Sequence, residues 1–425
     1  MKRIMFCLLT AVMVLTGCHA ADVELKDMDF QDMTEAAENI RQAADHIAAG
    51  EALETGETLE TEASENERTD SDVDAAVAEN KEKQVLHDIS GMEKYAYSCL
   101  SDEEKSLYQE LYTILKNQDS DVEVSVCDVE MVDKVFQYVM ADHPELFYVD
   151  GYSVNKYMRG EELKKLTASG TYTYSPEEVA DLREQIGRCV DKILQEVPAG
   201  GGEYEKVKFV YEYLIEHTEY DLAAEDNQNI CSVFLNQRSV CQGYAKAAQY
   251  LFDKIGIYST LVTGTVSSGA GHAWNLVRVD GEYYYVDPTW GDASYVMREG
   301  SSGYQGNPPS INYEYLCVTT EQLCRTHTID PVIPMPECNS MKNNYYVREG
   351  AYFETVDMDK VKGLFEKSYE NGTECVTLKC ADDTVYRELQ RRLIEEQEVF
   401  HYLHSEDTRV AYTDNPKQNS LSFWL

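Results

Sequence analysis

Apolar residues in the middle of the chain follow one helical stretch and then three strand-like stretches. Between residues 239 and 256 they recur at helical spacing, and Gly256 suits the left-handed end of a helix. The strand-like runs cover residues 260–265, 273–279 and 283–286. Asp280-Gly281, between the last two runs, is a strong hairpin turn signal. This pattern predicts an α+β unit in which a helix packs on an antiparallel β-sheet.

Periodic patterns on both sides predict further folded units. Upstream, helices are expected over residues 101–115, 131–140 and 175–196, and strands over 146–149 and 170–174. Downstream, strands are expected over residues 345–347, 375–378 and 422–425, and helices over 357–369 and 385–397. The β-α-β-α-β order of this last segment favours a compact α/β subdomain.

The first 18 residues are typical of a lipoprotein signal peptide. Lys2 and Arg3 form a basic start, and residues 4–15 are mostly apolar but too short to span a membrane comfortably. The following Leu15-Thr16-Gly17-Cys18 resembles the lipobox of bacterial lipoproteins, in which the cysteine becomes the lipidated N-terminus. This resemblance implies lipidation at Cys18 and an exported protein anchored to the outer face of a bacterial cell membrane. A plain signal peptide cut near Ala20 is the alternative.

Acidic residues dominate the chain and restrict its partners. Lys and Arg total 37 against 77 for Asp and Glu, which gives a formal net charge of −40. Nucleic-acid binding requires a basic footprint, so the composition argues against a nucleic-acid partner. Residues 19–84 are rich in Asp and Glu and contain no aromatic residue except Phe30, which favours a disordered tether. We therefore expect membrane contact only through the lipid anchor.

Cys241 stands in the first turn of the predicted central helix. There the helix dipole and the unpaired backbone N–H groups favour a thiolate and lower the pKa of a thiol, which suits a nucleophile. Ala245, Ala248 and Phe252 share its helical face, so a buried structural cysteine is the alternative.

His272 and Asp287 lie on the two sides of the predicted hairpin. A two-residue loop pairs Val279 with Glu282, and in that register His272 and Asp287 project from the same face as diagonal neighbours. Diagonal Cβ atoms lie within ~7–8 Å, so the carboxylate can orient the imidazole through a hydrogen bond. A helix packed over this face would supply Cys241. The pattern predicts a Cys–His–Asp relay for nucleophilic acyl transfer.

Three segments around these residues resemble the transglutaminase-like superfamily, whose members are relatives of papain-type cysteine proteases. The chain reads SVCQGYA, HAWN and YVDPTW in this order, and it departs from the family's GVCQGYA only at Ser239. Residues 219–221 and 143–147 also resemble bacterial secreted and lipoprotein members of the superfamily. The resemblance is strong over residues 203–295 and looser over 95–202 and 296–345.

The resemblance implies a papain/transglutaminase-like core with three assigned roles. Cys241 would be the nucleophile, His272 the general base and acid, and Asp287 the residue that orients His272. The predicted organisation is a signal peptide at 1–18, an acidic disordered tether at 19–84, an N-terminal α/β region at 85–202, a transglutaminase-like core at 203–300, a loop-rich extension at 301–344 and a C-terminal α/β subdomain at 345–425.

Other residues near the predicted relay are candidates for an oxyanion hole or a cleft. The backbone N–H of Cys241 is one natural oxyanion donor. The side-chain and cleft candidates are Gln242, Asn236, Gln237, Gly243, Trp274 and Tyr220. A turn or capping role for the polar residues, and a packing role for the two aromatic residues, are the alternatives.

No metal or other cofactor is expected. Cysteine and histidine residues at 317, 324, 327 and 338 could be imagined as zinc ligands, as could those at 375, 380, 401 and 404. Neither set has the spacing of paired CxxC ligands.

Two classes of function remain open from the sequence. The first is a cell-surface enzyme that acts on peptide or carboxamide bonds through a Cys thioester, with water as acceptor in a peptidase or amidase, or an amine as acceptor in protein cross-linking. Its partner would be a peptide or protein substrate at the cell envelope. The second is a non-catalytic binding or scaffold module that retains the fold.

Overall fold

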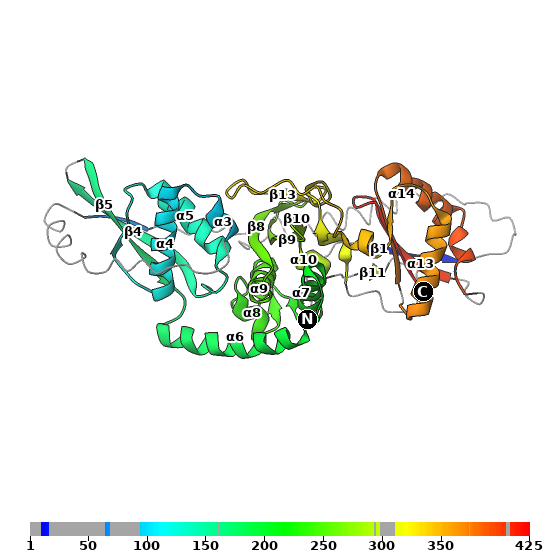
Figure 1. Cartoon of the computed structure of the whole chain (residues 1–425), viewed down its shortest axis with the longest axis horizontal. Helices are drawn as coiled ribbons and strands as arrows, with labels where there is room; N and C mark the ends of the chain where they lie inside the picture. Colours follow the sequence, from blue (N-terminus) through cyan, green and yellow to red (C-terminus); the bar gives the residue numbers. More distant parts are fainter. Residues whose placement is uncertain are drawn as a thin grey trace, which may run out of the picture.

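The computed structural model describes residues 10–16, 64–68, 94–159, 161–292, 295–297, 311–373, 375–404 and 409–425. Most of these residues form three units in a row along the long axis of the molecule (Figure 1). We call them the N-terminal, central and C-terminal units. The N-terminal and central units share one hydrophobic core, whereas the C-terminal unit has a core of its own.

The N-terminal unit contains three helices and a small sheet. The helices are α3 (Tyr95–Ser98), α4 (Asp102–Asn117) and α5 (Val129–Asp142). The sheet has the order β2-β4-β5-β3, with β2 (Ser64–Arg68), β3 (Val122–Glu123), β4 (Val149–Arg159) and β5 (Glu162–Tyr172). Helix α6 (Pro176–Glu196), capped by Ser175, leads from this unit to the central one.

Buried Asp142 connects the N-terminal unit to the central sheet through hydrogen bonds. Its carboxylate accepts hydrogen bonds from the backbone N–H groups of Ala96 and Tyr97 at 3.1 and 2.9 Å and from the Tyr108 hydroxyl at 3.0 Å. The Thr260 hydroxyl, from the central unit, donates to it at 3.3 Å. Burial raises the pKa of this carboxyl.

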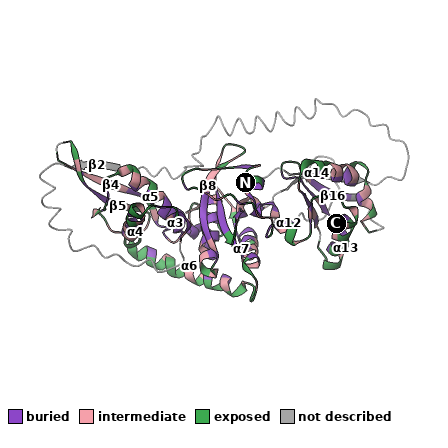
Figure 2. Ribbon diagram, turned by 45° about the horizontal axis from the view of Figure 1, so that its top comes forward, coloured by how far each residue is buried: buried purple, intermediate pink, exposed green. Residues whose placement is uncertain are grey.

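The central unit has the predicted architecture, a helix packed on an antiparallel sheet. Helix α9 (Cys241–Ile255) contacts β8 (Tyr258–Val266) and β9 (Gly271–Val279), and Asn275 donates to the Ala245 carbonyl at 2.9 Å. The sheet order is β12-β10-β9-β8-β13, and its strands are largely buried (Figure 2). Helix α7 (Glu203–His217), the short β6 (Glu219–Tyr220), α8 (Ile230–Phe234) and β7 (Arg238–Ser239) precede α9.

The predicted hairpin register is confirmed. Strand β9 pairs with β10 (Glu282–Val286), with Val279 opposite Glu282 and Asn275 opposite Val286. Asp280 and Gly281 have φ values of 51° and 85°, which suit the two-residue hairpin turn that their sequence favours.

Residues 301–344 differ from the predicted loop-rich extension as far as they are described. Two three-residue strands, β12 (Leu316–Val318) and β13 (His327–Ile329), complete the two edges of the central sheet. Between them lies α11 (Thr320–Leu323), and η2 (Tyr313–Tyr315) precedes them. Strands this short produce no periodic pattern, which explains why the sequence did not reveal them.

The C-terminal unit has an α/β fold whose elements differ from the predicted ones at several places. The strands over Tyr352–Phe353 and Arg409–Asn415 were not predicted. Residues 345–347 are part of a helix, α12 (Tyr345–Arg348), capped by Asn344, and not of a strand. After β14 (Tyr352–Phe353), α13 (Met358–Asn371), β15 (Cys375–Cys380) and α14 (Asp383–Gln390), the chain ends in the hairpin β16 (Arg409–Asn415) and β17 (Ser420–Trp424). The expected helix over 385–397 is α14 followed by a π turn over Arg391–Glu395.

Strand β1 (Thr10–Thr16) and β11 (Tyr295–Met297) extend the C-terminal sheet, whose order is β11-β1-β16-β17-β15-β14. Both differ from the predicted organisation, because β1 lies within the predicted signal peptide and β11 within residues 203–300, which were assigned to the core. Strand β2 lies within the predicted disordered tether and pairs with β4, a contact that the composition of the segment does not reveal. Cys18 and the rest of the predicted tether lie outside the described residues. No helix of the described part of the chain is long and apolar enough to cross a membrane.

Candidate functional site

Cys241 is the first residue of α9 and is partly exposed. The N-cap residue Val240 has no polar side chain, so it cannot cap the first backbone N–H groups of the helix. The helix start is packed closely: a Cβ at Gly243 would lie 1.9 Å from Oγ of Ser239 and 2.8 Å from the carbonyl oxygen of Asn227. Ser239 itself donates to that carbonyl at 2.9 Å. The close packing at the start of α9, and with it the position of Cys241, therefore requires a glycine at 243 and a small residue at 239.

His272 and Asp287 meet where the hairpin ends. His272 lies near the start of β9, and Asp287 follows β10 as the N-cap of α10 (Pro288–Gly291). Nε2 of His272 lies 2.7 Å from Oδ2 of Asp287, while Oδ1 of Asp287 accepts from the backbone N–H of Trp290 at 3.1 Å. The His272 side chain is 6% exposed and that of Asp287 is fully buried.

The charges of this pair support one another. Burial disfavours the imidazolium, but the Asp287 carboxylate and a side-chain hydrogen bond with Cys241 outweigh it and raise the pKa of His272 to about 10. Burial also opposes ionisation of Asp287, yet the charge and hydrogen bond of His272 hold the pKa of this carboxyl well below its usual range. Because Nε2 faces Asp287, Nδ1 is the ring nitrogen that is left for the Cys241 thiol.

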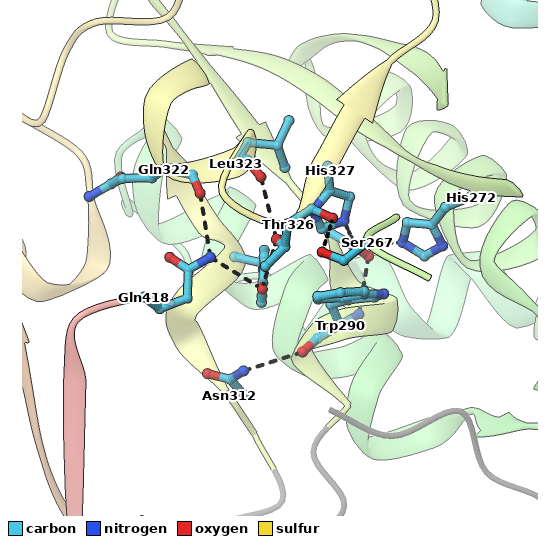
Figure 3. A network of polar contacts seen from close by, with 11 residues as sticks. Ser267, His272, Trp290, Asn312, Gln322, Leu323, Thr326, His327 and Gln418 are labelled. Atoms are coloured by element: carbon cyan, nitrogen blue, oxygen red, sulfur yellow. Dashed lines mark hydrogen bonds and ion pairs between the residues drawn. The ribbon is translucent and has the colours of Figure 1, made fainter. Parts of the chain in front are cut away.

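A second histidine, His327 on β13, binds the same carboxylate. Figure 3 shows its ring near that of His272. Its Nε2 lies 3.1 Å from Oδ2 of Asp287, and its side chain is fully buried. The sequence analysis considered His327 only as a zinc ligand. His327 lies 40 residues beyond Asp287 on a three-residue edge strand, so no local pattern pointed to this contact.

Aromatic rings surround the two histidines. Trp274 is fully buried with its ring stacked 5.8 Å from that of His272, and Trp290 lies 6.0 Å from His272 and 4.6 Å from His327. Burial, and then the charges of Cys241 and Asp287, raise the pKa of Tyr220, which places this tyrosine beside the site. These rings keep water away from the imidazoles, so their electrostatic interactions are strong.

The remaining polar candidates occupy different positions. Gln242 is buried in the first turn of α9. Asn236 and Gln237 are exposed in the turn between α8 and β7, and Gln237 has a φ of 55° while its carbonyl accepts from the N–H of Glu219 at 2.8 Å. This geometry fits a turn role for Gln237, which the sequence analysis gave as the alternative to a role in an oxyanion hole.

The described residues contain one group whose donor atoms could hold a metal ion, namely His272, Asp287 and His327. The cysteines and histidines that the sequence analysis considered as two zinc sets do not form such a group in the described part of the chain. Both imidazole Nε2 atoms and Oδ2 of Asp287 are already joined by hydrogen bonds within the group. All ten cysteines between residues 99 and 380 are free.

Comparisons with known proteins find similarity in the region that contains this site. Residues 173–288 match the transglutaminase-like superfamily, so the chain contains a transglutaminase-like domain. Over 123 residues the chain is 30% identical to the kyphoscoliosis peptidase of Homo sapiens, and over 127 residues it is 28% identical to the Mus musculus protein of the same name. These matches cover 25% and 26% of this chain but only 18% and 19% of the relatives.

Among solved structures, one described as the crystal structure of a TGase aligns with 38% of this chain and 55% of its own, at 13% sequence identity and a TM-score of 0.24. The sheet topology and the family match confirm the α+β fold with a transglutaminase-like core that the sequence predicted.

Proposed function

We propose that this protein is a cysteine-dependent acyl-transfer enzyme that acts on peptide or carboxamide bonds, exported and held on the outer face of a bacterial cell membrane by a lipid on Cys18. The observation that supports the enzymatic part is the 2.7 Å contact between His272 and buried Asp287, together with the interaction of His272 with Cys241 at the start of α9.

The first half of the reaction follows from the charges of the site. The Cys241 thiolate attacks the carbonyl carbon, and the resulting oxyanion lies at the α9 N-terminus, where the Cys241 backbone N–H can donate to it. The protonated His272 then gives its proton to the leaving nitrogen as the C–N bond breaks. The product is a thioester on Cys241 and a free amine.

The second half returns the enzyme to its starting state. His272, now neutral, takes a proton from water or from an acceptor amine, which attacks the thioester carbon. The C–S bond breaks and the Cys241 thiolate is restored beside the His272 imidazolium. Throughout, Asp287 keeps Nε2 of the ring protonated and Nδ1 turned toward sulfur. Water as acceptor makes the protein a peptidase or amidase, and an amine makes it a cross-linking enzyme.

A turnover assay with the full chain tests this proposal and separates the two acceptors. A peptide library containing glutamine is incubated with the protein and a biotinylated primary amine, and mass spectrometry follows both peptide cleavage and amine incorporation. We expect one of these products from the wild-type chain and neither from Cys241→Ala. Cys99→Ala, which changes an exposed free cysteine, is the matched control and should keep the activity. No Cys241-dependent product with any peptide or amine would favour the binding or scaffold module.

A further inference from the structure

A chain of hydrogen bonds runs from the C-terminal unit to the carboxylate of the candidate site. Figure 3 labels three of its members, Gln418, Thr326 and His327. Nε2 of Gln418 lies 3.3 Å from the Tyr315 hydroxyl, which lies 3.1 Å from Oγ1 of Thr326. That oxygen lies 2.9 Å from Nδ1 of His327, whose Nε2 lies 3.1 Å from Oδ2 of Asp287. This chain of hydrogen bonds leads from the turn before β17, where Gln418 lies, to Asp287, which follows β10.

Only one direction of donation satisfies the whole chain. The Asp287 carboxylate can only accept, so Nε2 of His327 carries a proton and donates it. In a neutral His327 the other nitrogen, Nδ1, must then accept from the Thr326 hydroxyl. Thr326 in turn accepts from Tyr315, and Tyr315 accepts from the Gln418 amide. Thr326 also lies 3.4 Å from the Leu323 carbonyl, but the 2.9 Å contact with His327 is the shorter one.

The members of this chain are buried and held in place. Gln418 is 1% exposed, accepts from Nζ of Lys379 at 2.9 Å and lies 3.4 Å from the Gln322 carbonyl. Burial lowers the pKa of His327, which favours the neutral ring that the donation pattern requires. The other titratable side chains that face Asp287 are His272 on β9, Tyr220 on β6, Tyr211 on α7 and Tyr315 on η2.

We propose that His327 is a positioning residue for the Cys241–His272–Asp287 relay, and that the C-terminal unit helps to set it through Gln418. The inference rests on the proposed function, because it assigns a second support to the carboxylate of the same site. Among the described residues, Oδ1 of Asp287 has one donor, the Trp290 N–H, and Oδ2 has two, His272 and His327. Without His327, the carboxylate loses the donor that fixes Oδ2 independently of His272.

The reactivity of Cys241 at low pH reports this positioning without requiring a substrate. At pH 6 an ordinary thiol, with a pKa of about 8.5, is almost fully protonated and reacts slowly with iodoacetamide. The proposed relay predicts that Cys241, which interacts with His272, is alkylated faster at this pH than cysteines outside the site. The rate of Cys241 alkylation in the full chain is measured from pH 5 to 9 by peptide mass spectrometry, with exposed Cys99 and Cys127 as internal references.

Two amide replacements separate the hydrogen bond from simple packing. His327→Gln places an amide N–H near the position of Nε2 and can still donate to Asp287, whereas the shorter His327→Asn cannot reach it. We expect His327→Asn to lower the alkylation rate at pH 6 by about 10-fold or more, the scale of a lost hydrogen bond to a charged group, and His327→Gln to restore most of it. Gln418→Ala should lower the rate about 3-fold, the scale of a neutral hydrogen bond, whereas Gln390→Ala, elsewhere in the C-terminal unit, should not.

Each failure has a distinct meaning. If Cys241 of the wild-type chain reacts no faster at pH 6 than Cys99 and Cys127, the proposed function itself fails. Suppose that Cys241 of the wild-type chain is alkylated faster than the reference cysteines. The positioning role of His327 is then overturned if the His327→Asn variant has the same alkylation rate at pH 6 as the wild-type chain. It is also overturned if the His327→Gln variant is alkylated as slowly as His327→Asn.

Two further variants complete the test. If Cys241 is alkylated at the same rate in Gln418→Ala as in Gln390→Ala, the contribution of the C-terminal unit is overturned. If His327→Asn melts at a much lower temperature than the wild-type chain, Thr326→Val decides instead. It removes only the hydroxyl that donates to Nδ1, and an unchanged rate in this variant overturns the role of His327.

Discussion

At the residue scale, the site depends on one carboxylate that orders two imidazoles. The hairpin register placed Asp287 beside His272 from the sequence alone, because side chains two residues apart on a strand share a face. The second imidazole, His327, was not predictable. It reaches Asp287 from an edge strand of three residues, and contacts made by such strands leave no periodic signal.

Replacing Asp287 tests how far orientation of the imidazole matters. Asp287→Ala should leave partial acyl-transfer activity, because the thiol and His272 remain, but the loss could reach about 10⁴-fold, as when an orienting carboxylate is neutralised in a related relay. The measurement is kcat with any substrate identified by the turnover assay. Activity equal to the wild type in a folded Asp287→Ala protein would remove Asp287 from the relay.

The ion pair also predicts how stability depends on pH. The pKa of His272 is raised from 6.5 to about 10, so its contribution is fully present below pH 6.5 and is lost as pH rises toward 10. The pKa of Asp287 is lowered from 3.8, so its contribution is present above pH 3.8 and is lost in acid. Urea unfolding should therefore show a decline in the free energy of unfolding between pH 6.5 and 10 that is smaller in His272→Gln. Equal declines in both proteins would contradict the charged His272.

At the element scale, the start of α9 is the feature on which the site depends. The sequence predicted this helix from its periodicity and its glycine end, and the three strands from strand-like runs and the Asp280-Gly281 turn signal. It did not predict the long β4–β5 hairpin, and it assigned residues 345–347 to a strand where the Asn344 cap starts a helix. Local cap chemistry outweighed the β propensity of these tyrosines and valine.

The close packing beneath α9 gives a sharp test with a matched control. Gly243→Ala would bring a Cβ to 1.9 Å from Oγ of Ser239, so we expect a loss of about 1–3 kcal/mol in the free energy of unfolding and a displaced Cys241. Gly187→Ala, in α6 with nothing within 4 Å of the new Cβ, should instead stabilise by up to about 1 kcal/mol. Thermal unfolding and Cys241 alkylation measure the two effects. Equal behaviour of both variants would show that the α9 start is not tightly packed.

At the scale of the whole molecule, one continuous core joins the N-terminal and central units, and polar contacts join the C-terminal unit to them. Glu314 of the central unit accepts hydrogen bonds from Asn415, at 2.7 Å, and from Ser420. The patterning divided the folded part into segments at 85–202, 203–300, 301–344 and 345–425. It did not predict this polar interface, because its partners are about 100 residues apart.

The lipobox makes a prediction about the whole molecule in the cell. Wild-type protein expressed in a bacterium should partition into detergent and begin at Cys18, because the lipid is attached there. Cys18→Ser should be released or remain unprocessed. Phase partitioning with Triton X-114 and N-terminal mass spectrometry measure both. A detergent-independent wild-type protein that begins at Ala21 would contradict lipidation at Cys18.

Covalent acylation of the thiol tests the central claim most directly. The full chain is mixed with p-nitrophenyl acetate at pH 7, and the acyl group is located by intact-protein and peptide mass spectrometry. Our account predicts a rapid burst that places one acetyl group per chain on Cys241, absent in Cys241→Ala, strongly slowed in His272→Ala and unchanged in Cys99→Ala. Acetyl groups spread over the exposed cysteines at a rate indifferent to His272 would contradict it.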